Sequence, residues 1–362
     1  MLFDSGAYYT ADIKMTPTPH TEDLLTEDDA YAGDVIETGD NQLETEAEEC
    51  PLEKADLYYE QDKLGQVKAL LESVDPEILE KKHHSMLRRA EEAENLVRDM
   101  KAKPEGGSWV DQGISRGKFP TRILYRLEEG ENKIELRARC ETPIKKDLLE
   151  SLFCVLNETE LYKTWLPSFS VPRFKITECR KLKQIGRVSQ ILLVVMELPW
   201  PMAAREIVIS AAAFDDIEEN GHIGIKLKNI ESNDDETVPE ATSKTVRVDI
   251  DGGFLFEACP RDHPAMQYVS KDEEDEHLLV TFTAVINPNM TILPQSFLNF
   301  MVKIALGTSW KILLQIAQDV KDGKKPDHTS AMARKRDEVY DYIKERVETM
   351  LATLKSVDIT GT

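Results

Sequence analysis

The chain of 362 residues has few cysteines and no long apolar run. Its five cysteines are scattered without a CxxC spacing, so neither a disulfide framework nor a zinc site is expected. No stretch approaches about 18 uninterrupted apolar residues, which a membrane-spanning helix needs. Met1–Thr10 has no basic segment followed by an apolar one, so we expect no secretory signal and a cytoplasmic protein.

Positive charge is also in short supply. The chain has 67 acidic residues against 45 lysines and arginines, which gives a formal net charge of -22. Nucleic-acid binding needs a cationic surface that displaces counterions from phosphates. We therefore expect no nucleic-acid partner.

The common catalytic motifs are absent as well. The sequence has no Gly-x-Ser-x-Gly elbow, Walker loop, His-Glu-x-x-His motif or paired metal-ligand spacing. His83-His84 falls in an expected helix, where a surface pair is the default interpretation. Asp262-His263 falls in an expected loop, and no nucleophile or base can be placed beside it. No metal, cofactor or catalytic residue is predicted.

Negative charge gathers at the start of the chain. Residues 1–52 hold 14 acidic side chains against one lysine, Lys14. Such a segment has too little apolar surface to offset the entropy lost on ordering. We predict a disordered acidic leader, which acts either as a tail for a protein partner or as a solubilising segment.

A helical hairpin is expected over residues 53–103. Apolar residues from Leu57 to Val74 recur at three, four and seven positions, and a second stripe runs from Leu79 to Met100. Between them, Asp75 is a candidate N-cap and Pro76 a first helical residue. The hairpin is too small to be a domain, so it must pack on the next module, on itself or on a partner.

From Phe119 onward the apolar period changes to two. In Lys133–Glu141, Ile134, Leu136, Ala138 and Cys140 share one face, which is typical of a half-buried antiparallel strand. Thr121–Glu128 alternates in the same way, and a helical segment follows over Ile144–Leu161. Further strands are expected at Phe174–Leu182, Arg187–Leu198, Ala204–Phe214, His222–Ile230, Thr245–Ala258 and His277–Ile286.

A long helix is expected at Gln295–Val320, and it is apolar around more than half of its circumference. Such a helix must lie against a large apolar surface. The order of elements predicts an α+β fold, with a curved antiparallel sheet closed over this helix. Bent around the helix, the sheet would enclose a cavity. The acidic runs Glu231–Ser243 and Lys271–Glu276 are expected to be exposed loops.

Four segments resemble a known family. Leu198–Val208 (Leu-Pro-Trp-Pro-Met-Ala-Ala-Arg-Glu-Ile-Val) resembles the Trp-Pro-x-x-x-Arg-Asp segment of START (steroidogenic-acute-regulatory-related lipid-transfer) domains. Asp251–Gly253 resembles a glycine-bearing strand of that family, Pro288–Pro294 its junction into the closing helix, and Leu161–Pro167 its early aromatic segment. The resemblance covers about Gly113–Val320, and it places a START-like lipid-binding domain at residues 108–322.

This resemblance implies a helix-grip fold that holds one lipid or sterol in a tunnel under the C-terminal helix. Glu206 stands where the family usually has Asp. Periodicity alone allows the same apolar residues to fill a solid core, whereas the resemblance favours a lined cavity. The predicted lipid-binding residues are Ile191, Leu193, Val195, Arg205, Phe254, Phe256, Phe282, Ala284, Phe297, Met301 and Ile304.

Two residues of the Trp-Pro segment have a further expected role. Trp200 lies between two prolines at the end of a strand, and the resemblance places it in a loop that gates the tunnel, where it would meet a membrane interface. The alternative is a tryptophan that plugs the sheet. Arg205 and Glu206 are adjacent on a strand and so point to opposite faces. Arg205 is expected either to hold a lipid head or to form an ordinary ion pair.

An amphipathic helix is predicted at residues 330–357, after the basic run Lys321–Arg336. The run either steers the protein to anionic lipid heads or is a solvated linker. The favoured function is lipid binding and transfer, in which one lipid or sterol is exchanged transiently at a membrane surface, with peripheral attachment there. The alternatives are an adaptor that senses a ligand and recruits a protein through the hairpin or leader, and an enzyme that uses the cavity as a template.

Overall fold

The structure is a computed structural model. It describes residues 50–104, 108–129, 134–168, 173–200, 202–242, 244–270, 277–289, 298, 302 and 306–360. All but the last three residues of the predicted leader lie outside this part of the chain. The same holds for Phe297, Met301 and Ile304.

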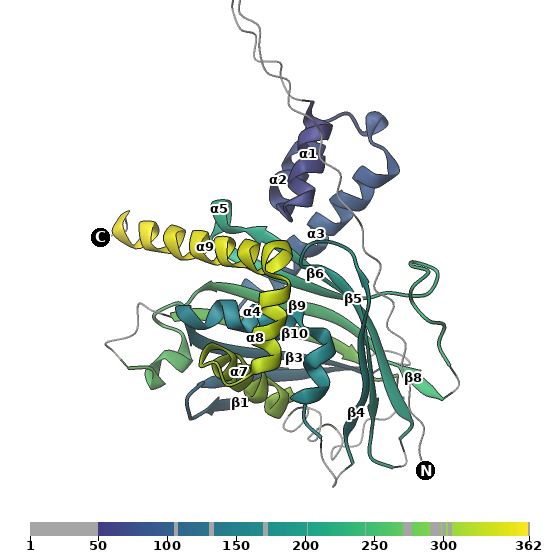
Figure 1. Cartoon of the computed structure of the whole chain (residues 1–362), viewed down its shortest axis with the longest axis vertical. Helices are drawn as coiled ribbons and strands as arrows, with labels where there is room; N and C mark the ends of the chain where they lie inside the picture. The colour runs from purple at the N-terminus through teal and green to yellow at the C-terminus, as the bar shows by residue number, and fades with distance from the viewer. Residues whose placement is uncertain are drawn as a thin grey trace, which may run out of the picture. The chain divides into compact units, whose positions relative to one another are not determined.

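Within the described residues, ten strands form one open sheet (Figure 1). Its order is β1-β2-β3-β10-β9-β7-β6-β5-β4, with every neighbouring pair antiparallel, and the short β8 pairs in parallel with β6. The strands are β1 (Val110–Ser115), β2 (Thr121–Glu129), β3 (Ile134–Lys145), β4 (Lys175–Gln184), β5 (Gln190–Glu197), β6 (Ala204–Asp216), β7 (His222–Asn229), β8 (Thr245–Arg247), β9 (Asp249–Ala258) and β10 (His277–Asn287).

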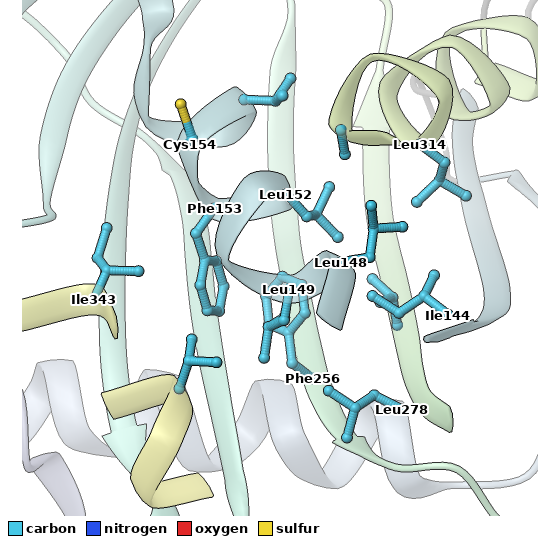
Figure 2. Close-up of a cluster of buried hydrophobic side chains, with 14 of the residues drawn as sticks. Ile144, Leu148, Leu149, Leu152, Phe153, Cys154, Phe256, Leu278, Leu314 and Ile343 are labelled. Carbon is cyan, nitrogen blue, oxygen red and sulfur yellow. The ribbon is translucent and has the colours of Figure 1, made fainter. Parts of the chain in front are cut away.

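Two helices cover one face of this sheet. They are α4 (Leu149–Asn157) and α7 (Gly307–Lys321), which also contact each other. We call this side the pocket face, and it carries Phe254, Phe256 and Phe282. Figure 2 shows the core between α4 and the sheet, where side chains of α4 pack among residues of β9, β10 and α7. Phe153 of α4 meets Phe256 edge to face, with ring centroids 4.7 Å apart.

The opposite side, which carries Leu255 and which we call the hairpin face, is covered by α3 (Lys81–Lys101), and α2 (Leu64–Glu72) contacts it at β6. α1 (Pro51–Glu60) packs on α2, and the 3-10 turn Pro76–Ile78 lies between α2 and α3. Leu96 of α3 packs against Leu255. The neighbouring Gly253 has no room for a side chain, because an added Cβ would lie 2.0 Å from the carbonyl oxygen of Ile225. The predicted hairpin thus packs on the sheet of its own chain.

The first helix of the predicted hairpin is divided in two. The break falls at Asp62, whose φ of 58° lies in the left-handed region. The predicted N-cap is confirmed, because the Asp75 carboxylate accepts the Glu77 N–H. It caps the 3-10 turn, however, and α3 begins only at Lys81.

The end of the chain folds back onto α4. It consists of α8 (Pro326–Arg334), a π-helical turn at Arg336–Tyr340 and α9 (Asp341–Thr360), so the predicted single helix is broken. Glu158, beside α4, receives hydrogen bonds from Lys335 (2.7 Å) and from the Tyr340 hydroxyl (2.5 Å). Despite the burial of Glu158, these two donors hold the pKa of its carboxyl below the usual value.

The predicted α+β helix-grip architecture is confirmed, in the form of a large open antiparallel sheet with a C-terminal helix laid across it. Three smaller segments add to the expectation or differ from it. β1 was not predicted, the strand expected at Thr245–Ala258 divides into β8 and β9, and Ile217–Asn220 forms the short helix α5. The 3-10 turns Lys146–Leu148, Thr159–Thr164 and Pro264–Tyr268 complete the described elements.

A candidate lipid-binding pocket

An apolar pocket of about 370 Å³ opens between the pocket face and α7. Its walls are the inward residues of successive strands, such as Leu192 and Val194 of β5, Ile207 and Ile209 of β6, and Leu227 of β7. A volume of this size falls within the range of small-molecule sites, which are concave and mostly apolar.

Aromatic rings form one side of the pocket. Trp310 of α7 lies nearly parallel to Phe254 at 6.2 Å between ring centroids, and Phe254 and Phe282 are 4.9 Å apart. The indole N–H of Trp310 donates to the Thr142 hydroxyl at 2.8 Å. The N–H therefore has a partner outside the pocket. This bond fixes α7 against the sheet and turns only carbon toward the pocket.

Arg205 is the one charged residue among the described residues that line the pocket. Its side chain is 6% exposed, and it forms no ion pair with any residue that the structure describes. Nη1 donates to the carbonyl of Ala203 at 2.7 Å, whereas Nε has no hydrogen-bond partner. Desolvation lowers the pKa of this guanidinium below its ordinary value, because no carboxylate compensates the burial.

Glu206, the next residue, points to the other face, as strand alternation requires. Its carboxylate accepts from the Thr245 hydroxyl at 2.8 Å and pairs with Arg247 at 2.9 Å. This acid therefore joins β6 to the β8 segment and leaves Arg205 unneutralised. A buried cation facing an apolar space is costly unless something completes its hydrogen bonds.

A second buried donor belongs to the part of the pocket wall formed by the turn Thr159–Thr164 and the residues after it. Trp165 lines the pocket and meets Tyr162 edge to face at 5.3 Å, but its indole N–H has no partner. The Tyr162 hydroxyl is satisfied by the carbonyl of Leu156. Burial raises the pKa of Tyr162 above its ordinary value, so the phenol stays neutral.

Of the residues predicted from the sequence, Arg205, Phe254, Phe282 and Ala284 line the pocket. Phe256 shares their face but lies farther along β9, where it is fully buried beneath α4. It belongs to the packed core.

The inward face of β5 differs from the expectation. Ile191, Leu193 and Val195 point to the hairpin face, where they pack with Val208 and Val238. Their neighbours Leu192, Val194 and Met196 line the pocket instead. The cause is that β5 is apolar at six consecutive positions, because the segment bearing Val238 covers its second face. Alternation therefore gives no signal, and the expected exposed loop Glu231–Ser243 includes a buried residue.

Trp200 is the most exposed of the large apolar side chains that the structure describes, at 92%. It occupies the turn between β5 and β6, where the N–H of Met202 donates to the carbonyl of Pro199. Two residues earlier, Leu198 lines the pocket. The alternative of a tryptophan that plugs the sheet is wrong, because the side chain is in solvent.

The basic run Lys321–Arg336 is largely neutralised by its own surroundings. Four of its six cations have acidic partners, namely Lys321 with Asp147, Lys324 with Asp322, Lys335 with Glu158, and Arg336 with Asp341.

Two histidines noted in the sequence have structural contacts. His83 accepts the N–H of Glu80 in a capping box at the start of α3. His263 Nε2 lies 3.2 Å from Glu141, and its Nδ1 accepts the Ala265 N–H.

In the described part of the chain, no three His, Cys, Asp or Glu side chains gather as metal ligands. None of the helices described there combines the length and apolarity that crossing a bilayer requires.

Solved START-type structures resemble this fold. Human STARD10 matches with a TM-score of 0.46 at 11% identity, over 70% of this chain and 86% of that one. Human StAR-related lipid transfer protein 5 matches with 0.44 at 14%, over 64% and 94%. A STAR-related lipid transfer protein from Xanthomonas axonopodis matches with 0.40 at 17%, over 59% and 99%. No protein-family model matches the sequence, and no curated protein matches it significantly.

Proposed function

We propose that this protein binds one lipid in the pocket between the sheet and α7 and exchanges it at membrane surfaces. The observation that carries the proposal is the pocket of about 370 Å³, in which one unneutralised cation, Arg205, stands among apolar walls. A ligand that fits such a site has a long apolar body and one polar end.

The polar end of the ligand is anionic in this proposal. The Arg205 guanidinium has N–H donors without protein partners, and a carboxylate or phosphate would satisfy them and its charge together. Trp165 adds an unpaired N–H that fits a second oxygen of the ligand. The chemistry favours an acidic lipid over a sterol, whose hydroxyl carries no charge.

Exchange needs contact between the mouth of the pocket and a bilayer. Trp200 is suited to that contact, because a tryptophan with a free indole settles at the level of lipid headgroups. Its position two residues beyond the pocket-lining Leu198 puts the proposed membrane contact next to the ligand.

Native mass spectrometry of the full chain tests the binding proposal. The lipid-free protein is mixed with phosphatidylcholine vesicles that contain oleic acid or, in a parallel sample, cholesterol. We expect one equivalent of the acid to be bound and the signal to be lost in Arg205→Met. Failure to retain any lipid, either from the vesicles or from the expression host, would refute the proposed function.

Substitution of Trp200 tests the membrane step separately. We expect Trp200→Ala to slow transfer of a bound fluorescent fatty acid to vesicles by about fivefold, since one interfacial anchor contributes on the order of 1 kcal/mol. Equilibrium binding of the fatty acid in detergent should not change, because the side chain lies outside the pocket. Ile185→Ala, at a turn where the apolar side chain is 40% exposed, is the matched control. Equal transfer rates in the wild type and the Trp200 variant would remove the membrane role.

A further inference from the structure

A second, smaller cavity of about 80 Å³ continues the pocket along the same strands. Leu156, Ala211 and Ile225 line both spaces, so they mark the junction between them. On β6 the inward residues run from Arg205 through Ile207, Ile209 and Ala211 to Ala213. The first four line the pocket, and the last two line the smaller cavity.

We propose that this smaller cavity, called the recess below, receives the end of the ligand's apolar chain and sets the longest chain that the protein accepts. The inference rests on the proposed function, with the acidic head of the lipid at Arg205. Although several polar residues border the recess, the surface that they turn toward it is almost entirely carbon. An apolar chain end fits this surface better than a hydroxyl does.

Small side chains keep the recess open. Ile207 and Ile209 on the same face of β6 are large, whereas Ala211 and Ala213 are the smallest residues with a Cβ. The backbone of Ala213 is held in place, because its carbonyl accepts from Arg89 at 3.1 Å and its N–H donates to the Ser189 hydroxyl at 3.1 Å. Empty apolar space destabilises a fold, so a purely structural sheet would favour larger residues here.

Elements from both ends of the described chain border the recess beyond Ala213. Tyr342, Ile343 and Arg346 of α9 line it. Arg346 pairs with Asp215 and with Glu218, and the Tyr342 hydroxyl donates to the carbonyl of Gln61 at 3.3 Å. These polar contacts hold α9 against the sheet, so a chain that reaches this wall has no further room.

The length of acyl chain that fits can be estimated from the rise of β6 between Arg205 and the recess. Six residues separate Arg205 from Ala211, or about 20 Å at the usual rise of about 3.3 Å per residue. An extended hydrocarbon advances roughly 1.3 Å per carbon for bonds of about 1.5 Å, so about 15 or 16 carbons reach the junction. Ala213 is two residues farther, so about 20 carbons fill the recess.

The test compares straight-chain fatty acids of different length. Lipid-free full-length protein is equilibrated with phosphatidylcholine vesicles that contain equal amounts of the acids with 14, 16, 18 and 20 carbons, and the bound acids are measured by native mass spectrometry. Ala213→Leu fills the recess. Ala212→Leu adds the same atoms one residue earlier, where the side chain points to the other face.

We expect Ala213→Leu to lower binding of the 18- and 20-carbon acids by tenfold or more relative to the 14-carbon acid, since even one misplaced methylene costs about 10-fold or more. Ala212→Leu should leave the wild-type ratio unchanged. If Ala213→Leu does not fold, Ala213→Val, with a smaller added volume, should shift the ratio in the same direction. Unchanged ratios in a folded Ala213 variant that still binds acids would overturn the recess assignment alone, whereas wild-type protein that binds no acid would overturn the proposed function.

Discussion

Replacing Arg205 with methionine should stabilise the lipid-free protein and at the same time strongly weaken binding of acidic lipids. Methionine keeps an unbranched side chain of similar length and removes the charge. Most substitutions at a buried position destabilise a protein. The opposite sign is expected here because Arg205 is buried without an acidic partner among the described residues.

The magnitude follows from two separate contributions. Burial of an uncompensated ion costs several kcal/mol, and the Ala203 carbonyl together with water in the pocket offsets part of that. We therefore expect Arg205→Met to raise the free energy of unfolding by about 1–3 kcal/mol, which corresponds to a rise in Tm of roughly 3–8 °C. Loss of the charged contact should weaken binding of an acidic lipid by about 2–4 kcal/mol, or roughly 30- to 1,000-fold.

The gain in stability should not depend on pH. Burial lowers the pKa of Arg205 from 12.5, so the group destabilises the fold wherever it is charged, which includes the whole range from about pH 5 to 9. Urea unfolding of lipid-free wild type, Arg205→Met and Arg205→Lys at pH 5, 7 and 9 measures this. The lysine variant keeps the charge and should remain near the wild type in stability. A methionine variant that is less stable than the wild type would show that Arg205 has a structural role, and the reasoning would fail.

Two further predictions concern the fold that holds the pocket. Glu158→Gln should cost about 3 kcal/mol, because the buried carboxylate that binds Lys335 and Tyr340 is lost. The folded-state pKa of Glu158 lies below the unfolded value of 4.5, so its stabilising contribution is present above pH 4.5 and disappears as the pH falls. Urea unfolding from pH 7 to 3 should therefore show the free energies of unfolding of the wild type and the variant converging. Gly253→Ala should destabilise by about 3 kcal/mol or prevent folding, since the new Cβ would lie 2.0 Å from the carbonyl oxygen of Ile225. Thermal unfolding measures this, with Gly186→Ala, which has ordinary contacts, as control; an unchanged Tm would contradict the predicted clash.

The sheet was predictable where the two faces of a strand differ in polarity along the sequence. Residues of β3 alternate clearly between apolar and charged, and Leu136 and Ala138 from its predicted apolar face line the pocket. The alternation of Arg205 and Glu206 was equally visible, and the structure places them on opposite faces. β1 gave no such signal, because Val110–Ser115 is an exposed edge strand with few apolar residues.

Local sequence therefore determined the α+β order, the strands with alternating polarity, the N-cap at Asp75 and the placement of Arg205 and Glu206 on opposite faces of β6. Only the folded chain decided which face of β5 is inward, because Leu192 and Leu193 are equally apolar and the difference lies in what covers each face. The unpaired state of Arg205 and the empty space beside Ala213 are also tertiary properties. Arg205 is unpaired because no carboxylate among the described residues lies beside it, and the space beside Ala213 is empty because no side chain from elsewhere in the chain fills it. A local sequence pattern cannot show which distant residues pack at a given position.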